Sequence, residues 1–196
     1  MRQFVLTITV LVVAAGTSPC DAQKAHELSG SRTTGIPLVN FSSDDGTGYG
    51  LRVNHFEYDG TSVPYRRKYS AQAFITTGGK WVHRLLVDAP QFWPGQRLEA
   101  ELVYQKEDFA NYYGNLSDEE ADSYSKDQKT FRQAFPEFRI KWIGALRLPW
   151  RVRVGGRLSR NDITPNSSTG SVLADLAPLG ADGGFFAQVH GSLRYD

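Results

Sequence analysis

The sequence predicts an all-β fold of about eight antiparallel strands, from the alternation of apolar and polar residues, the length of the alternating segments and the turn residues between them. The clearest segment is "PWRVRVGGRLSR", residues 149–160. Even-numbered positions carry the apolar side chains of Trp150, Val152, Val154 and Leu158. Odd-numbered positions between them carry the cations Arg151, Arg153 and Arg157. A strand separates these groups onto two faces, whereas a helix would scatter them around its circumference.

The first residues predict a secretory signal. Arg2 is a positive start, residues 4–15 are an apolar run, and Cys20-Asp21-Ala22 resembles a cleavage site. The run is shorter than the roughly 20 residues of a membrane-spanning helix. We expect a signal peptide at 1–22 and a polar stub at 23–35. A lipid anchor on Cys20 is the alternative, although the Leu typical of such signals does not precede it.

Eight segments after the stub are predicted strands, and we assign 36–196 to one β-barrel domain. The segments are 36–42, 48–58, 65–77, 80–88, 97–107, 129–143, 149–160 and 183–195. Most are near the roughly 9–11 residues that a tilted strand needs to cross a bilayer. The Asp-Gly pair at 45–46 is a tight-turn signal. Pro136 predicts an unpaired or bulged position, because proline lacks the backbone N–H.

The two parities predict two environments: an antiparallel transmembrane β-barrel turns apolar side chains to lipid and polar ones to its interior. Our predicted lipid-facing residues are Leu98, Leu102, Trp142, Trp150, Val152, Val154, Leu158 and Val189. The predicted lumen-facing polar residues are Glu99, Glu101, Arg139, Lys141, Arg151, Arg153, Arg157, His190 and Arg194. We expect the two glutamates to pair inside a closed barrel with Arg139, Arg151, Arg153 or Arg157. Because parity does not separate inside from outside, a soluble β-sandwich or lipocalin-like barrel is the alternative.

The connections between strands predict an orientation. Segments 108–128 and 160–182 are long and polar, whereas 144–148 is short. Outer-membrane barrels have short periplasmic turns and longer external loops, so the long segments are expected outside. Aromatic residues gather near the strand ends, as at membrane interfaces. We therefore expect the cell outer membrane as the location, with membrane lipid and lipopolysaccharide as surroundings.

Several motifs carry a family resemblance. They are the Asp-Gly turn before a glycine-alternating strand in "LVNFSSDDGTGYGLRVNHFEYDG", Asp-x-Pro-x-Phe at 88–92, Phe-x-Asn-Tyr-Tyr-Gly at 109–114 and a final Tyr-Asp. Together, in this order over residues 36–196, they resemble the barrel domain of the BamA/TamA-type family, the bacterial surface antigens. The resemblance implies half of a 16-stranded barrel and a role in outer-membrane protein assembly or insertion. It also implies the barrel-assembly machinery as the partner for the chain's own insertion.

The resemblance leaves the closure of the barrel open. An unpaired sheet edge in lipid costs several kcal/mol for each backbone group, so half a barrel needs a partner. We expect a truncated product or fragment whose other half is supplied separately. A small closed barrel of eight strands and edge-to-edge pairing with another copy are the alternatives. A small passive pore is the alternative function.

Other function classes have weak signals. A formal net charge of +1 predicts no attraction to nucleic acid. The histidines at 26, 55, 83 and 190 lack metal-ligand spacing, and we expect no cofactor and no metal. His190 and Ser192 share a face, which makes an envelope lipid hydrolase an alternative. Because no acid that would orient the histidine is identifiable, we expect a protein that is not an enzyme.

An acidic run is the last candidate. It consists of Asp118, Glu119, Glu120 and Asp122 in the first long polar segment. Such a run is typical of a solvated loop, and binding of Ca²⁺ or of lipopolysaccharide bridged by divalent ions is the alternative.

Overall fold

The computed structural model describes residues 29–147 and 149–195, which form one antiparallel sheet and three short helices. The elements are β1 (Ser29–Ser42), β2 (Gly46–Asp59), β3 (Arg67–Thr76), β4 (Lys80–Trp93), β5 (Gln96–Asn111), α1 (Asp118–Ser123), α2 (Lys126–Lys129), β6 (Thr130–Arg147), β7 (Trp150–Pro165), α3 (Val172–Leu176) and β8 (Gly184–Tyr195). The strands lie in chain order from β1 to β8, each antiparallel to the next. The all-β, antiparallel, eight-stranded prediction is confirmed.

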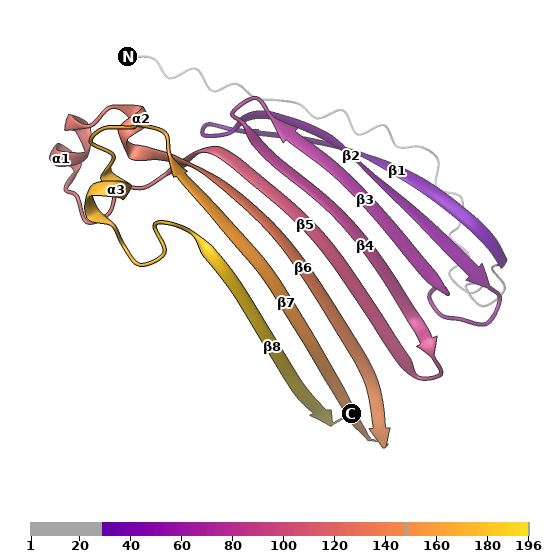
Figure 1. Cartoon of the computed structure of the whole chain (residues 1–196). Coiled ribbons are helices and arrows are strands. Elements are labelled where there is room, and N and C mark those ends of the chain that lie inside the picture. The colour runs from indigo at the N-terminus through magenta and orange to yellow at the C-terminus, as the bar shows by residue number, and fades with distance from the viewer. Residues whose placement is uncertain (1–28, 148, 196) are drawn as a thin grey trace, which may run out of the picture.

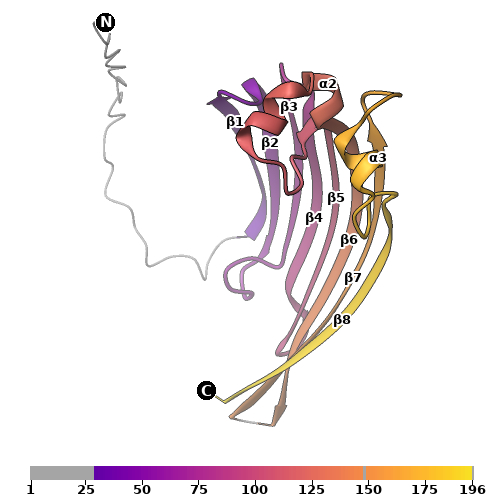
Figure 2. The same cartoon turned by 90° about the vertical axis from the view of Figure 1, so that its left-hand side faces the viewer.

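The sheet is curved but open. Figure 2 shows the strands bent into a trough, with β1 and β8 at its two edges. In the described part of the chain, β1 pairs with β2 and β8 pairs with β7, and the two edge strands do not pair with each other. The alternative of a small closed barrel is therefore not what this chain forms. Both edges leave backbone groups free to pair with another polypeptide.

The strands extend further into polar sequence than the alternation predicted. Residues 29–35, expected in the polar stub, are the first half of β1 and pair with residues 53–59 of β2. The Thr33 hydroxyl also lies 2.9 Å from Nδ1 of His55 across this pair. Pairing needs only backbone partners, so it continues where the side chains no longer alternate. The predicted signal peptide and residues 23–28 lie outside the described residues.

The prediction for Pro136 is confirmed. Pro136 is opposite Tyr104 on β5. On the β7 side, the paired positions pass from Ala134–Asp162 directly to Glu137–Ser159. The strand therefore loses pairing on the side where the missing N–H would have been needed.

The two ends of the sheet differ. The loop end carries the connections 43–45, 77–79, 112–129 and 166–183, and all three helices gather there (Figure 1). The turn end carries 60–66 and 94–95, and β6 also ends and β7 begins there. Both long polar connections thus lie together, as the sequence predicted. None of the helices in the described part of the chain has the length and apolar character needed to cross a membrane.

Candidate functional site

One face of the sheet, called the outer face here, is apolar and uncovered. Its composition is clearest along a row of paired positions that crosses all eight strands. The row consists of Gly35, Val53, Ala71, Leu85, Leu102, Phe138, Leu158 and Ala187. Leu102 is 50% exposed and Leu158 48% exposed, because no second layer packs on them. This face would expose a continuous apolar surface to whatever surrounds the chain.

The opposite, inner face is polar and more buried. The next row of paired positions consists of Thr34, Asn54, Ser70, Leu86, Glu101, Arg139, Arg157 and Gln188. Asn54 on this face is buried, and so are Asp88, Glu137 and Ser159. Among the described residues the buried hydrophobic side chains are only Ala89, Val103, Val172 and Leu173. The sheet therefore lacks the apolar core that a soluble β-sandwich builds between two layers.

Ion pairs connect the strands of the inner face. Glu101 lies 3.3 Å from Arg139 and 3.9 Å from Arg84. Glu137 contacts both Arg139 and Arg157, and its side chain is only 1% exposed. A buried carboxylate needs such partners, since an unpaired charge out of water is strongly unfavourable. These contacts join β4, β5, β6 and β7 into one charged network.

A second network lies toward the turn end. Arg97 donates to both carboxylate oxygens of Asp88, at 2.9 and 2.8 Å, and also lies 2.9 Å from Glu99. Glu99 contacts Lys141 on β6 as well. The hydroxyl of Tyr65, in the connection between β2 and β3, donates to Asp88 at 2.5 Å. Burial, with the Asp88 carboxylate next in effect, raises the pKa of this hydroxyl. The Asp-x-Pro-x-Phe segment thus begins at a buried carboxylate that joins β4 to β5 and to the connection between β2 and β3.

The structure separates the two predicted groups of residues onto the two faces. The residues predicted to face lipid lie on the outer face, and those predicted to face a lumen lie on the inner face. Their assignment to lipid and lumen stays a prediction. The expected pairing of Glu101 with Arg139 is observed. Glu99 pairs with Lys141 and with Arg97 of its own strand, and not with one of the four predicted arginines. Arg157 instead contacts Glu137, which the sequence reasoning missed although it lies on the same parity as Arg139.

The basic and histidine residues near the β8 edge lie on the inner face as predicted. Arg151 and Arg153 of β7 are opposite Arg194 and Ser192 of β8. His190 is opposite Gly155, and a Cβ at that glycine would meet the imidazole ring. Among residues 29–147 and 149–195, no hydrogen bond or ion pair joins His190 or Ser192 to a carboxylate. The pair therefore lacks the oriented geometry of a catalytic triad.

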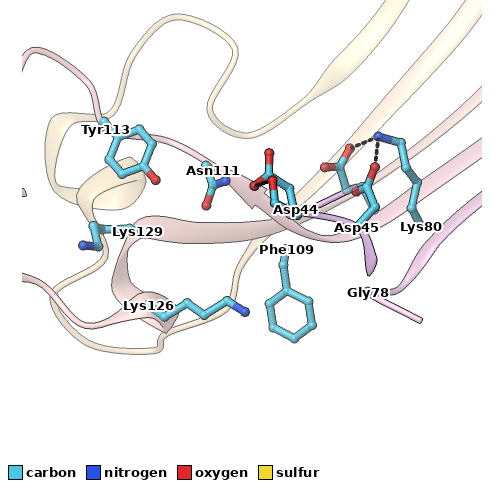
Figure 3. A pocket seen from close by; sticks show the side chains of 11 residues that line it. Asp44, Asp45, Gly78, Lys80, Phe109, Asn111, Tyr113, Lys126 and Lys129 are labelled. Atoms are coloured by element: carbon cyan, nitrogen blue, oxygen red, sulfur yellow. Dashed lines mark hydrogen bonds and ion pairs between the residues drawn. The ribbon is translucent and has the colours of Figure 1, made fainter. Parts of the chain in front are cut away.

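A pocket of about 450 Å³ opens at the loop end (Figure 3). Its walls come from the β1–β2 and β3–β4 connections, the end of β5 and helix α2. The polar lining residues are Ser43, Asp44, Asp45, Lys80, Glu107, Asn111, Lys126 and Lys129, and the aromatic ones are Phe109 and Tyr113. These segments are distant in sequence, and the sequence reasoning assigned them no site. Asp45 was predicted there only as a turn residue.

The acidic run forms helix α1. The side chains of Ser117 and Glu120 cap the start of this helix reciprocally. Hydrogen bonds from the backbone and hydroxyl of Ser117 lower the pKa of Glu120. Within the described ranges, no group of three or more His, Cys, Asp or Glu residues is placed to hold a metal ion. Glu120, one of the four acidic residues, therefore has a structural role in capping the start of helix α1.

Comparisons with protein-family models, with curated proteins and with solved structures find no match to this chain.

Proposed function

We propose that the chain is a wall segment of an outer-membrane β-barrel, with its outer face in hydrocarbon and its inner face toward a polar lumen. One observation carries the proposal: apolar side chains line the face on which no second layer packs, while charged side chains occupy the opposite, more buried face. A sheet in water has the opposite arrangement, because its apolar face is buried against a second layer.

The size of the apolar face supports the same environment. Soluble monomers rarely expose contiguous apolar patches above a few hundred Å². Here the apolar row crosses every strand, and large side chains such as Val154 and Val189 remain 45% and 83% exposed. Hydrocarbon satisfies such a surface, and the charges on the opposite face pair with one another away from it.

The open edges support a role in assembly. In lipid, free backbone groups along β1 and β8 must pair with another strand. The partner that we propose is a second barrel half or another copy of the chain. An edge that accepts strands suits the assembly or insertion of outer-membrane proteins, which is the role implied by the resemblance to the BamA/TamA-type family.

The membrane placement is tested with two labelled variants in a chain whose Cys20 is changed to Ser. Leu102→Cys places an environment-sensitive fluorophore on the outer face of β5, and Gln105→Cys places it on the inner face as the matched control. After insertion into vesicles, lipids brominated on their acyl chains should quench the first label several-fold more than the second. Equal quenching, or a label at 102 that stays in water, would overturn the proposal.

The assembly role has a separate test. Vesicles that contain the inserted chain are mixed with an unfolded outer-membrane barrel, and its folding rate is compared with that in empty vesicles. Acceleration supports the role. An unchanged rate contradicts assembly and leaves the membrane placement to the labelling experiment.

A further inference from the structure

The loop-end pocket has an acidic side that is largely fixed by the protein itself. Lys80 lies 3.1 Å from Asp45 and 3.8 Å from Glu107, so one ammonium group is shared by two carboxylates. Asp44 accepts a 3.3 Å hydrogen bond from the hydroxyl of Ser43, and its side chain is otherwise exposed. This side keeps an excess of negative charge, with the Asp44 carboxylate open to a ligand.

The other side of the pocket is basic. The ammonium of Lys126 lies 4.8 Å from the centre of the Phe109 ring, a favourable cation–π position. Lys129 donates to the backbone carbonyl of Ala121 at 2.8 Å, which uses one of its three donors. In the part of the chain that the structure describes, neither lysine forms an ion pair. Their charges therefore remain available to an anion.

The two sides do not neutralise each other across the pocket. Figure 3 places Lys129 and Tyr113 on one side, Lys80 and Asp45 on the other, and Asp44 and Asn111 between them. The lining holds three lysines and three carboxylates, and Lys80 pairs with Asp45 and Glu107. Among the described residues, Lys126 and Lys129 form no ion pair with these carboxylates. A purely anionic ligand would meet the carboxylates, and a purely cationic one would meet the free lysines. Like charges placed together weaken binding, so the pocket favours neither.

We propose that this pocket binds a small zwitterion that carries a protonated amine and a phosphate or carboxylate. The amine would donate to the Asp44 carboxylate, and the anion would accept from Lys126 and Lys129. Charge-assisted hydrogen bonds of this kind are about twice as strong as neutral ones. The Asn111 amide can bond the polar atoms between the two charged groups, beside the apolar Phe109 ring. The same chemistry occurs in a free solute and in the headgroup of a zwitterionic lipid.

Phosphoethanolamine is the probe, with ethylamine and inorganic phosphate as its two halves. Calorimetric titration of the folded full chain in detergent should show phosphoethanolamine binding at least about tenfold more tightly than either half. Affinity no better than that of phosphate alone would overturn the proposal. Short-chain phosphatidylethanolamine separates the two sources: tighter binding than the free probe indicates a lipid headgroup, and weaker binding a free solute.

Matched variants show whether the named residues hold the probe. Lys126→Gln and Asp44→Asn should each weaken phosphoethanolamine binding by about tenfold. Lys68→Gln is the control for the first variant, since Lys68, like Lys126, lies over a phenylalanine ring, that of Phe56, but outside the pocket. Asp118→Asn, in exposed helix α1, is the control for the second. Equal losses in variants and controls, or no loss in either, would contradict the assignment. The titration needs no bilayer, so its outcome is independent of the membrane placement.

Discussion

The inner and outer faces of the sheet are built from the same strands and differ in almost every physical property. On β5, Glu99 and Glu101 of the inner face contact charged side chains of the neighbouring strands. Leu98 and Leu102, which alternate with them, lie in apolar rows of the outer face. Because β-strand side chains alternate strictly, one backbone supports both surfaces. The comparison shows that polar pairing on the inner face holds this sheet together, where a soluble sheet would have an apolar core.

The difference also shows where stability is concentrated. Inner-face residues are held by specific partners, so changing one leaves a defined group without its counterpart. Outer-face residues have few specific partners, and their contribution depends on the surrounding medium. Variants on the inner face should therefore change the free energy of unfolding in any folding environment. Charges introduced on the outer face should change it through their contact with lipid.

The largest expected effect comes from the inner face. Glu137→Gln removes the carboxylate that Arg139 and Arg157 both contact. Breaking a buried ion pair costs about 3–5 kcal/mol, and we expect about 3 kcal/mol because both arginines are partly exposed. Guanidinium unfolding in detergent micelles measures the loss. Glu57→Gln is the control: its pair with Arg67, at 3.6 Å, is exposed, so we expect below about 1 kcal/mol. Similar losses would contradict the distinction.

The next effect tests the outer face in lipid. Leu102→Arg places a cation within the apolar row near the middle of β5. A charge on the lipid face costs about 2–4 kcal/mol at the bilayer midplane, and we expect about 2 kcal/mol. The measurement is the free energy of unfolding of the chain folded into vesicles. Gln105→Arg, on the inner face of the same strand, should change it by less than about 1 kcal/mol. A larger loss from the control than from Leu102→Arg would break the comparison.

The smallest effect comes from two adjacent glycines of β7. A Cβ at Gly155, on the inner face, would meet the His190 ring and lie 3.1 Å from the backbone carbonyl oxygen of Ile140. A Cβ at Gly156, on the outer face, would have its nearest neighbours at 3.8 Å. We expect Gly155→Ala to destabilise by about 1 kcal/mol through overpacking. Gly156→Ala should stabilise by about 0.5 kcal/mol by restricting the unfolded chain. Unfolding of both variants in micelles provides the check. Stabilisation by Gly155→Ala together with destabilisation by Gly156→Ala would contradict the assignment of the two faces.

Much of the fold could be predicted because its signals are local. The alternation at 149–160 and 97–107 indicated strands, and the proline at 136 indicated interrupted pairing. Residues 29–35 were missed because their side chains do not alternate, although their backbone pairs fully with β2. The contacts of Glu137 and Asp88 were missed because ion pairs between strands depend on the register of the two strands. The sequence of one strand alone does not specify that register.

By itself, the sequence determined which residues share a face, because the side-chain period of two is a property of each strand alone. The tertiary structure decided three further features. Register selected the partners of Glu101 and Glu137, the packing of the strands left the charged face more buried than the apolar one, and the order of the strands left β1 and β8 as open edges. The tertiary structure also brought the 43–45 turn, Lys80, the end of β5 and helix α2 together around one pocket. Such contacts form between segments that are distant in sequence, and the residue pattern within one segment does not predict which other segments will lie beside it.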